Sequence, residues 1–183
     1  MLDDRHGRAY VGNFGYDLFS EEPRATQLIL VRPDRSAVKL DHDLVFPNGM
    51  ALRSDSRLVV AETFAQRLAL FAVGDDGALT PDGAIALDED IYPDGICVDA
   101  EDAVWLASVF SQEVVRVEKD GTVERVPVSQ NAYACMLGGE DRRTLYVATA
   151  PDHEPENRRA RAEGRIEAVR VTVPGVGGEG LGL

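Results

Sequence analysis

Two short polar side chains stand in matching positions of the chain, 46 residues apart. Asn48 and Asp94 each follow a proline and precede a glycine, and an apolar, β-rich run begins just after each of them. Amide and carboxylate oxygens are the ligands that a hard divalent cation such as Ca²⁺ or Mg²⁺ prefers. Asn and Asp before glycine are also ordinary turn residues, but the repetition of the whole Pro-x-Gly setting favours a functional pair. We therefore predict that Asn48 and Asp94 supply oxygen ligands to one metal ion.

A sequence repeat positions these two residues. The interval from Gly49 to Ala61 is twelve residues, and the interval from Gly95 to Ala107 is also twelve. With two weaker copies, the matched positions are Gly12, Ala61, Ala107 and Ala148, which are 49, 46 and 41 residues apart. Periods of about 40 to 50 residues are typical of the four-stranded blades of a β-propeller. The predicted fold is all-β, an incomplete β-propeller of about four blades over residues 1–174, with a flexible Gly-rich tail at 175–183.

Strands are predicted from apolar runs bounded by turn residues. They cover residues 8–12, 27–31, 37–40, 49–52, 58–62, 67–73, 84–87, 96–98, 104–109, 113–118, 122–126, 135–137, 144–149 and 165–173. In an antiparallel meander, the residue before the first strand and the residue after the second lie at the same end. That end is predicted to collect Asn48, Asp94 and the connections 13–26, 62–66 and 150–164, which would rim a ligand pocket.

Other polar residues are weighed against simpler roles. Tyr133 holds the place in the third copy that Asn48 and Asp94 hold in theirs, so it is predicted to line the pocket without binding metal. Glu22, on the 13–26 connection, either reaches a ligand or is a solvated charge. Glu62 and Arg67 are interpreted as a structural ion pair. The three histidines show no metal-binding spacing, and no nucleophile motif supports Ser-His or Cys-His catalysis.

The composition restricts the partners and the compartment. A net charge of −13 argues against nucleic acid or an anionic membrane as a partner, because both need basic patches. No run approaches the roughly 18 apolar residues of a membrane span, and the first residues lack the basic and apolar regions of a signal peptide. The predicted location is the cytoplasm. Cys97 and Cys135, both on apolar β-rich runs, are predicted to be reduced and buried in neighbouring inner strands.

The chain resembles the SMP-30/gluconolactonase/LRE-like family, also called the regucalcin family, over about residues 2–173. The segments that carry the resemblance are Phe46-Pro47-Asn48-Gly49-Met50, Val60-Ala61-Glu62-Thr63-Phe64 with Arg67-Leu68, Pro93-Asp94-Gly95-Ile96-Cys97-Val98-Asp99-Ala100, and Ala134-Cys135-Met136-Leu137-Gly138-Gly139. Each motif is modest alone, since Pro-Asp-Gly is a common turn. Four of them in order at blade spacing are specific.

The resemblance implies a six-bladed β-propeller that binds one divalent cation near its axis and hydrolyses small lactones. It implies that Asn48 and Asp94 are metal ligands and that Asp94 also acts as the base on water. Ca²⁺ is the first expectation for the cation, with Zn²⁺, Mg²⁺ and Mn²⁺ as alternatives. Glu22 falls near a substrate-contacting glutamate of some members, so Glu22 and Tyr133 are the predicted substrate contacts.

The chain also departs from the family pattern. Members have an N-terminal part of about two blades that carries a glutamate metal ligand, and this chain has no counterpart of it. In the other blades the innermost strand lies about twelve residues before the matched position. Counting back twelve residues from Gly12 gives a position before Met1, so the first blade is expected to lack its innermost strand. We expect the C-terminal two thirds of a propeller, with open blade faces that promote self-association and with little lactonase activity when expressed alone.

Two other functions stay open at this point. One is a non-catalytic propeller that binds a metal or a partner through the same rim. The other is a related propeller without metal chemistry, such as the strictosidine synthase-like group, and the pairing of Asn48 with Asp94 counts against it.

Overall fold

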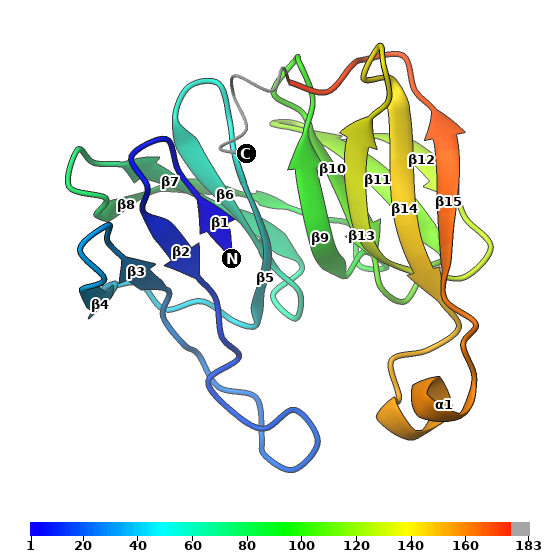
Figure 1. The fold of residues 1–183 in the computed structure, drawn as a ribbon, viewed down its shortest axis with the longest axis horizontal. Coiled ribbons are helices and arrows are strands. Elements are labelled where there is room, and N and C mark those ends of the chain that lie inside the picture. The colour runs from blue at the N-terminus through cyan, green and yellow to red at the C-terminus, as the bar shows by residue number, and fades with distance from the viewer. Residues whose placement is uncertain (177–183) are drawn as a thin grey trace.

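The computed structural model describes residues 1–176, which form four antiparallel sheets that follow one another as blades of a propeller (Figure 1). The first sheet contains β1 (Leu2–Asp3), β2 (Ala9–Val11), β3 (Ile29–Val31) and β4 (Ala37–Lys39), and the second contains β5 (Pro47–Leu52), β6 (Arg57–Glu62), β7 (Arg67–Val73) and β8 (Leu79–Ala86). The third contains β9 (Pro93–Val98), β10 (Val104–Ser108), β11 (Glu113–Glu118) and β12 (Gly121–Pro127), and the fourth contains β13 (Asn131–Gly138), β14 (Thr144–Ala150) and β15 (Arg165–Arg170). The innermost strands β5, β9 and β13 contact one another in that order. The prediction of an all-β propeller is confirmed.

Side chains of the middle strands point alternately to the two faces of their sheet, and they form one apolar core between each two neighbouring sheets. In β6, Leu58 and Val60 pack toward the first sheet, whereas Val59 and Ala61 pack toward the third. In β10, Val104 and Leu106 join the core with the second sheet, whereas Trp105 and Ala107 join the core with the fourth. Successive side chains of a strand point to opposite faces, so a strand that is apolar at every position is suited to a blade covered on both sides.

The first sheet contains an innermost strand, which corrects the expectation that it would have none. This strand, β1, pairs antiparallel with β2 but has only two residues. The turn between them is tied by the Asp4 carboxylate, which accepts hydrogen bonds from the backbone N–H groups of His6 (2.9 Å) and Arg8 (3.0 Å) and from the Arg8 guanidinium (2.6 Å). The repeat spacing counts from Gly49, a position within the six-residue strand β5, so it does not detect a two-residue strand closer to Gly12.

The packed chain extends beyond the predicted boundary at residue 174. Gly175 forms an isolated antiparallel bridge with Asp99, and its N–H donates to the Arg142 carbonyl (2.8 Å). These contacts hold Gly175 against the turns that follow β9 and β13. The rest of the predicted tail, residues 177–183, lies outside the described residues.

One end of the propeller carries the long connections. Figure 1 shows that the 13–26 connection and the short helix α1 (Pro155–Ala160), which lies in the 150–164 connection, project from the same end. This is the arrangement that the strand order predicts. Among residues 1–176, no helix is long and apolar enough to cross a membrane.

The two cysteines lie on neighbouring innermost strands, as predicted. Cys97 on β9 and Cys135 on β13 are both free thiols and both buried. The Cys135 thiol lies 3.4 Å from the Trp105 carbonyl oxygen. Both thiols border the core between the third and fourth sheets, where they pack as small apolar side chains.

Candidate functional site

Asn48, Asp94 and Tyr133 occupy equivalent places in three successive innermost strands. Each stands near the start of β5, β9 or β13, where the register with the neighbouring strand shifts. A β-bulge places an extra residue in one strand and changes the direction of its side chain. At these shifts Asn48, Asp94 and Tyr133 all line one cavity.

The glycines after Asn48 and Asp94 allow these strand starts to approach each other closely. A Cβ built on Gly49 would stand 2.4 Å from the Asp94 carbonyl oxygen, and one built on Gly95 would stand 2.7 Å from the Ala134 Cα. Both distances are far below a tolerable contact, so no residue with a side chain fits without a shift of the backbone. The glycine of the Pro-x-Gly motif is therefore required by packing between blades as well as by the local turn.

The side chains of Asn48 and Asp94 meet. The Asn48 side chain lies close enough to the Asp94 carboxyl group to lower its pKa, and its Nδ2 donates a hydrogen bond to Thr63 Oγ1 (3.4 Å). The buried Thr63 in turn donates through Oγ1 to the Pro93 carbonyl (2.7 Å). Thr63 thus links the end of β6 to the start of β9 and orients the amide beside the carboxyl group.

The Asp94 carboxyl group lies in an environment that disfavours its charge. Burial raises the pKa of Asp94 to about 7, and the neighbouring Asn48 amide offsets part of that rise. No lysine or arginine of residues 1–176 forms an ion pair with it. Burial likewise raises the pKa of the Tyr133 phenol. The site thus holds a carboxyl group without a cationic partner from the described chain.

A cavity of about 270 Å³ opens over this pair of residues, near the lower end of the range for small-molecule pockets. Asn48, Thr63, Asp94, Tyr133 and His153 are its polar lining residues. The remaining lining residues are apolar: Phe14, Leu18, Phe46, Phe64, Val109 and Phe110. The wall is therefore mostly hydrophobic and aromatic, and three of its polar residues, Asn48, Asp94 and Tyr133, lie near strand starts.

The aromatic wall was not predicted, although the repeat contains a signal for it. Phe64 and Phe110 each stand three residues after a matched alanine, Ala61 or Ala107, so they are equivalent positions 46 residues apart. Repeated aromatic residues are as visible in the sequence as the repeated polar pair, because they recur at the same 46-residue interval. His153 was also missed as a lining residue, because its place depends on how the 150–164 connection folds over the site.

The structure does not bring Glu22 to the cavity. It is exposed on the 13–26 connection and is absent from the lining residues, whereas Phe14 and Leu18 of the same connection are among them. The chain turns away from the site between these residues and Glu22, because the N–H groups of Ser20 and Glu21 bond the Asp17 carbonyl. The alternative interpretation of Glu22, a solvated charge, agrees with this position.

Glu62 has the structural role that its sequence position indicates. It is fully buried, its Oε2 pairs with the Arg67 guanidinium, and its Oε1 accepts the Val45 N–H (2.6 Å). It ties the chain before β5 to the adjacent strands β6 and β7. It does not line the cavity.

The donor chemistry at Asn48 and Asp94 fits part of a divalent-cation site. An amide and a carboxylate in contact are suitable oxygen donors for Ca²⁺, and the carboxylate has no competing cation in the described chain. Residues 1–176 contain no group of three or more acidic, histidine or cysteine side chains placed to hold a metal. The described chain therefore offers two neighbouring oxygen donors for such an ion.

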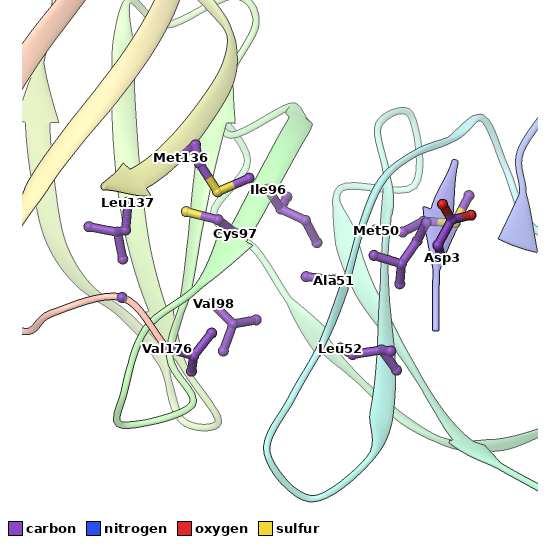
Figure 2. Close-up of a pocket in the computed structure, with 12 residues that line it drawn as sticks. Asp3, Met50, Ala51, Leu52, Ile96, Cys97, Val98, Met136, Leu137 and Val176 are labelled. Carbon is purple, nitrogen blue, oxygen red and sulfur yellow. The ribbon is translucent and has the colours of Figure 1, made fainter. Parts of the chain in front are cut away.

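A second cavity, of about 80 Å³, lies among the innermost strands (Figure 2). Met50 and Ala51 line one side, and Ile96, Cys97 and Met136 line the other, with Asp3 as the one acidic residue among the lining residues. The wall offers no pair of polar groups that could orient a substrate. This cavity is a packing space beside the propeller axis, separate from the one that contains Asp94.

Comparisons with known proteins agree with this architecture. Residues 1–151 match the model of the family described as the SMP-30/Gluconolactonase/LRE-like region. Regucalcin of Xenopus laevis is 32% identical over 90 residues, which is 47% of this chain and 30% of that protein.

Two solved structures extend the likeness over more of the fold. A luciferin-regenerating enzyme superposes with a TM-score of 0.79 at 16% identity, covering 100% of this chain and 64% of that one. A gluconolactonase of Xanthomonas campestris superposes with a TM-score of 0.59 at 27% identity, covering 68% of this chain and 42% of that one. The chain therefore spans less than two thirds of each of these proteins.

Proposed function

Because the chain belongs to the SMP-30/gluconolactonase/LRE-like family, we propose that it is a lactone hydrolase whose activity depends on a divalent cation held by Asn48 and Asp94. The observation that supports this most directly is the contact between these two side chains at the floor of the cavity, with no cationic residue of the described chain beside Asp94. Oxygen donors of this kind favour Ca²⁺. Zn²⁺, Mg²⁺ and Mn²⁺ are the alternatives, and adding each of them back after EDTA would distinguish them from Ca²⁺.

Each residue has a defined part in the proposed reaction. A bound divalent cation supplies Lewis acidity, which polarises a carbonyl group and makes water more acidic. Asp94 accepts a proton from the attacking water, the water oxygen bonds to the lactone carbonyl carbon, and the ring C–O bond breaks. The proton then passes to the released alkoxide, so the product is the open hydroxy acid. Thr63 and Asn48 hold Asp94 in place, and Tyr133 contacts the substrate from the wall.

The test is lactone hydrolysis with and without a chelator. In a chain that carries two additional N-terminal blades, we expect wild-type turnover to fall to the background rate in EDTA and to return with added Ca²⁺. The Asp94→Ala variant should stay at background in both conditions, whereas Asp120→Asn, an exposed carboxylate in a turn, should match wild type. Turnover that is insensitive to the chelator would exclude the metal mechanism.

A second candidate is cation binding without turnover. It is favoured by the small number of oxygen ligands. Residues 1–176 supply two, and a site with fewer carboxylates binds a cation more weakly, so a cation could bind without activating water for hydrolysis. In that case calorimetry would detect Ca²⁺ binding that Asp94→Ala removes, while no lactone is hydrolysed. The 183-residue chain alone is expected to show little lactonase activity, and a chain carrying two additional N-terminal blades with a further acidic ligand is expected to show more.

A further inference from the structure

The space above Asp94 is enclosed by aromatic side chains from separate parts of the chain. Phe14 comes from the 13–26 connection, Phe46 from the residue before β5, Phe64 from the 62–66 connection and Phe110 from the turn after β10. Phe46 is the centre of one group: its ring stacks on Phe14 at 4.0 Å with an interplanar angle of 6° and meets Phe64 at 4.6 Å. These contacts fix the positions of the rings before any ligand binds.

Several of these rings are exposed at the mouth of the cavity. Phe14, Phe64 and Phe110 have 38%, 39% and 49% of their surfaces exposed. Phe110 is held edge-on against Tyr92 at 5.1 Å and lies 6.1 Å from the His153 ring. Exposing large apolar side chains as a group costs free energy, and a contiguous patch of this kind marks a surface that binds an apolar ligand.

The polar groups of the same wall are mostly occupied. Thr63 donates to the Pro93 carbonyl and accepts from Asn48, whose side chain lies beside the Asp94 carboxyl group. With Asp94 engaged by the proposed cation, Tyr133 and His153 are the remaining polar side chains among the residues that line the cavity. A polyhydroxylated ring placed here would bury hydroxyl groups against phenylalanine, and each unpaired hydroxyl is costly.

We propose that the cavity selects lactones with an aromatic or alkyl body over polyhydroxylated sugar lactones. This inference rests on the proposed lactone hydrolysis and specifies its substrate class. The lactone carbonyl lies toward Asn48 and Asp94, and the apolar body lies between Phe64 and Phe110 at the mouth.

Binding of non-hydrolysable lactams separates selectivity from catalysis. Titration calorimetry with dihydroquinolinone, the lactam counterpart of dihydrocoumarin, and with gluconolactam should show at least about tenfold tighter binding of the aromatic lactam. Phe64→Ala and Phe110→Ala should each weaken dihydroquinolinone binding about tenfold, as expected for loss of one aromatic contact. The matched control is Phe19→Ala, because Phe19 is 64% exposed on the 13–26 connection and does not line the cavity.

The outcomes distinguish this inference from the proposed function. If dihydroquinolinone binds preferentially and the two variants weaken it, the selectivity stands even when no lactone is turned over. If gluconolactone is hydrolysed in a chelator-sensitive way while dihydrocoumarin is not, the lactonase function stands and the selectivity is wrong. Absence of dihydroquinolinone binding, or equal binding by wild type and the Phe64 and Phe110 variants, also overturns it.

Discussion

Gly49 lies so close to Asp94 that a Cβ on the glycine would stand 2.4 Å from the Asp94 carbonyl oxygen. The next glycine of the repeat, Gly95, stands in the same relation to the start of β13, where a Cβ would meet the Ala134 Cα at 2.7 Å. The fourth sheet has alanine at this position, and its Ala134 is exposed on the face that no later blade of residues 1–176 covers. The motif glycines thus set the distance between innermost strands, and with it the distance between the predicted ligands.

Replacing Gly49 by alanine should therefore separate Asn48 from Asp94. We expect Gly49→Ala to lower the free energy of unfolding by about 2 kcal/mol, because overpacking against backbone atoms forces a shift of the strands. Urea denaturation measures the loss. Gly164→Ala is the matched control, since the nearest atom to its added Cβ would be 3.6 Å away, and equal stability of the two variants would contradict the packing role of Gly49.

Calcium should stabilise the fold through Asn48 and Asp94. At a Ca²⁺ concentration about ten times Kd, the wild-type free energy of unfolding should rise by about 1.4 kcal/mol, because the ion binds only the folded state. Asp94→Ala and Asn48→Ala should lose this response, and EDTA should remove it from wild type. A calcium-dependent stabilisation that survives in Asp94→Ala would place the ion elsewhere.

Glu62 should matter for stability and not for cation binding. Glu62→Gln removes the charge that pairs with Arg67 while keeping an oxygen for the Val45 N–H, and we expect a loss of about 2 kcal/mol in the free energy of unfolding. Arg67 is partly exposed, so its charge remains solvated in the variant. The calcium response measured for wild type should persist in Glu62→Gln, and its disappearance would make Glu62 part of the site.

The buried pair of Asp4 and Arg8 should make stability depend on pH. Burial alone would raise the pKa of Asp4, but hydrogen bonds from the Arg8 backbone and guanidinium and from the His6 N–H outweigh it and hold the pKa below its ordinary value. A carboxyl group with a depressed pKa in the folded state stabilises above its unfolded pKa of about 3.9 and loses that contribution as pH falls through the folded value. Asp4→Asn should therefore cost about 2 kcal/mol at neutral pH and progressively less in acid. A difference between Asp4→Asn and wild type that is constant from pH 7 to pH 2 would show that the ion pair does not contribute.

The outer face of the fourth sheet should promote self-association. Met136 and Tyr146 are opposite each other in the β13–β14 register, and together with Ile166 on β15 they are 50%, 41% and 69% exposed. Large exposed apolar patches are sites of association. Sedimentation should show concentration-dependent oligomers that Ile166→Lys shifts toward monomer. Val123→Lys is the control, because Val123 is 51% exposed on β12 of the third sheet, and an equal effect of both variants would argue against this face.

The sequence by itself determined the blade architecture and the identity of the polar pair. Its 46-residue repeat is visible because every blade packs between neighbours and needs the same pattern of apolar side chains. The run from Val104 to Ala107, apolar at every position, alone indicates a strand buried on both faces. Asn48, Asp94 and Tyr133 follow from equivalence in that repeat. The repeat did not predict the short strand β1, because it reports the average spacing of blades and not the length of each strand.

The tertiary structure alone decided the character of the cavity. The repeat contains Phe64 and Phe110, but only the packed blades place these rings over Asp94. Phe14 and Phe46 come from segments whose positions depend on stacking between their own rings, which no period in the sequence encodes. The same is true of Glu22, which the turn at Asp17 directs away from the site. Bulges at the starts of β5, β9 and β13, together with glycine contacts between blades, bring the polar residues to one point. These are distances between distant backbone segments, and they arise only when the blades pack.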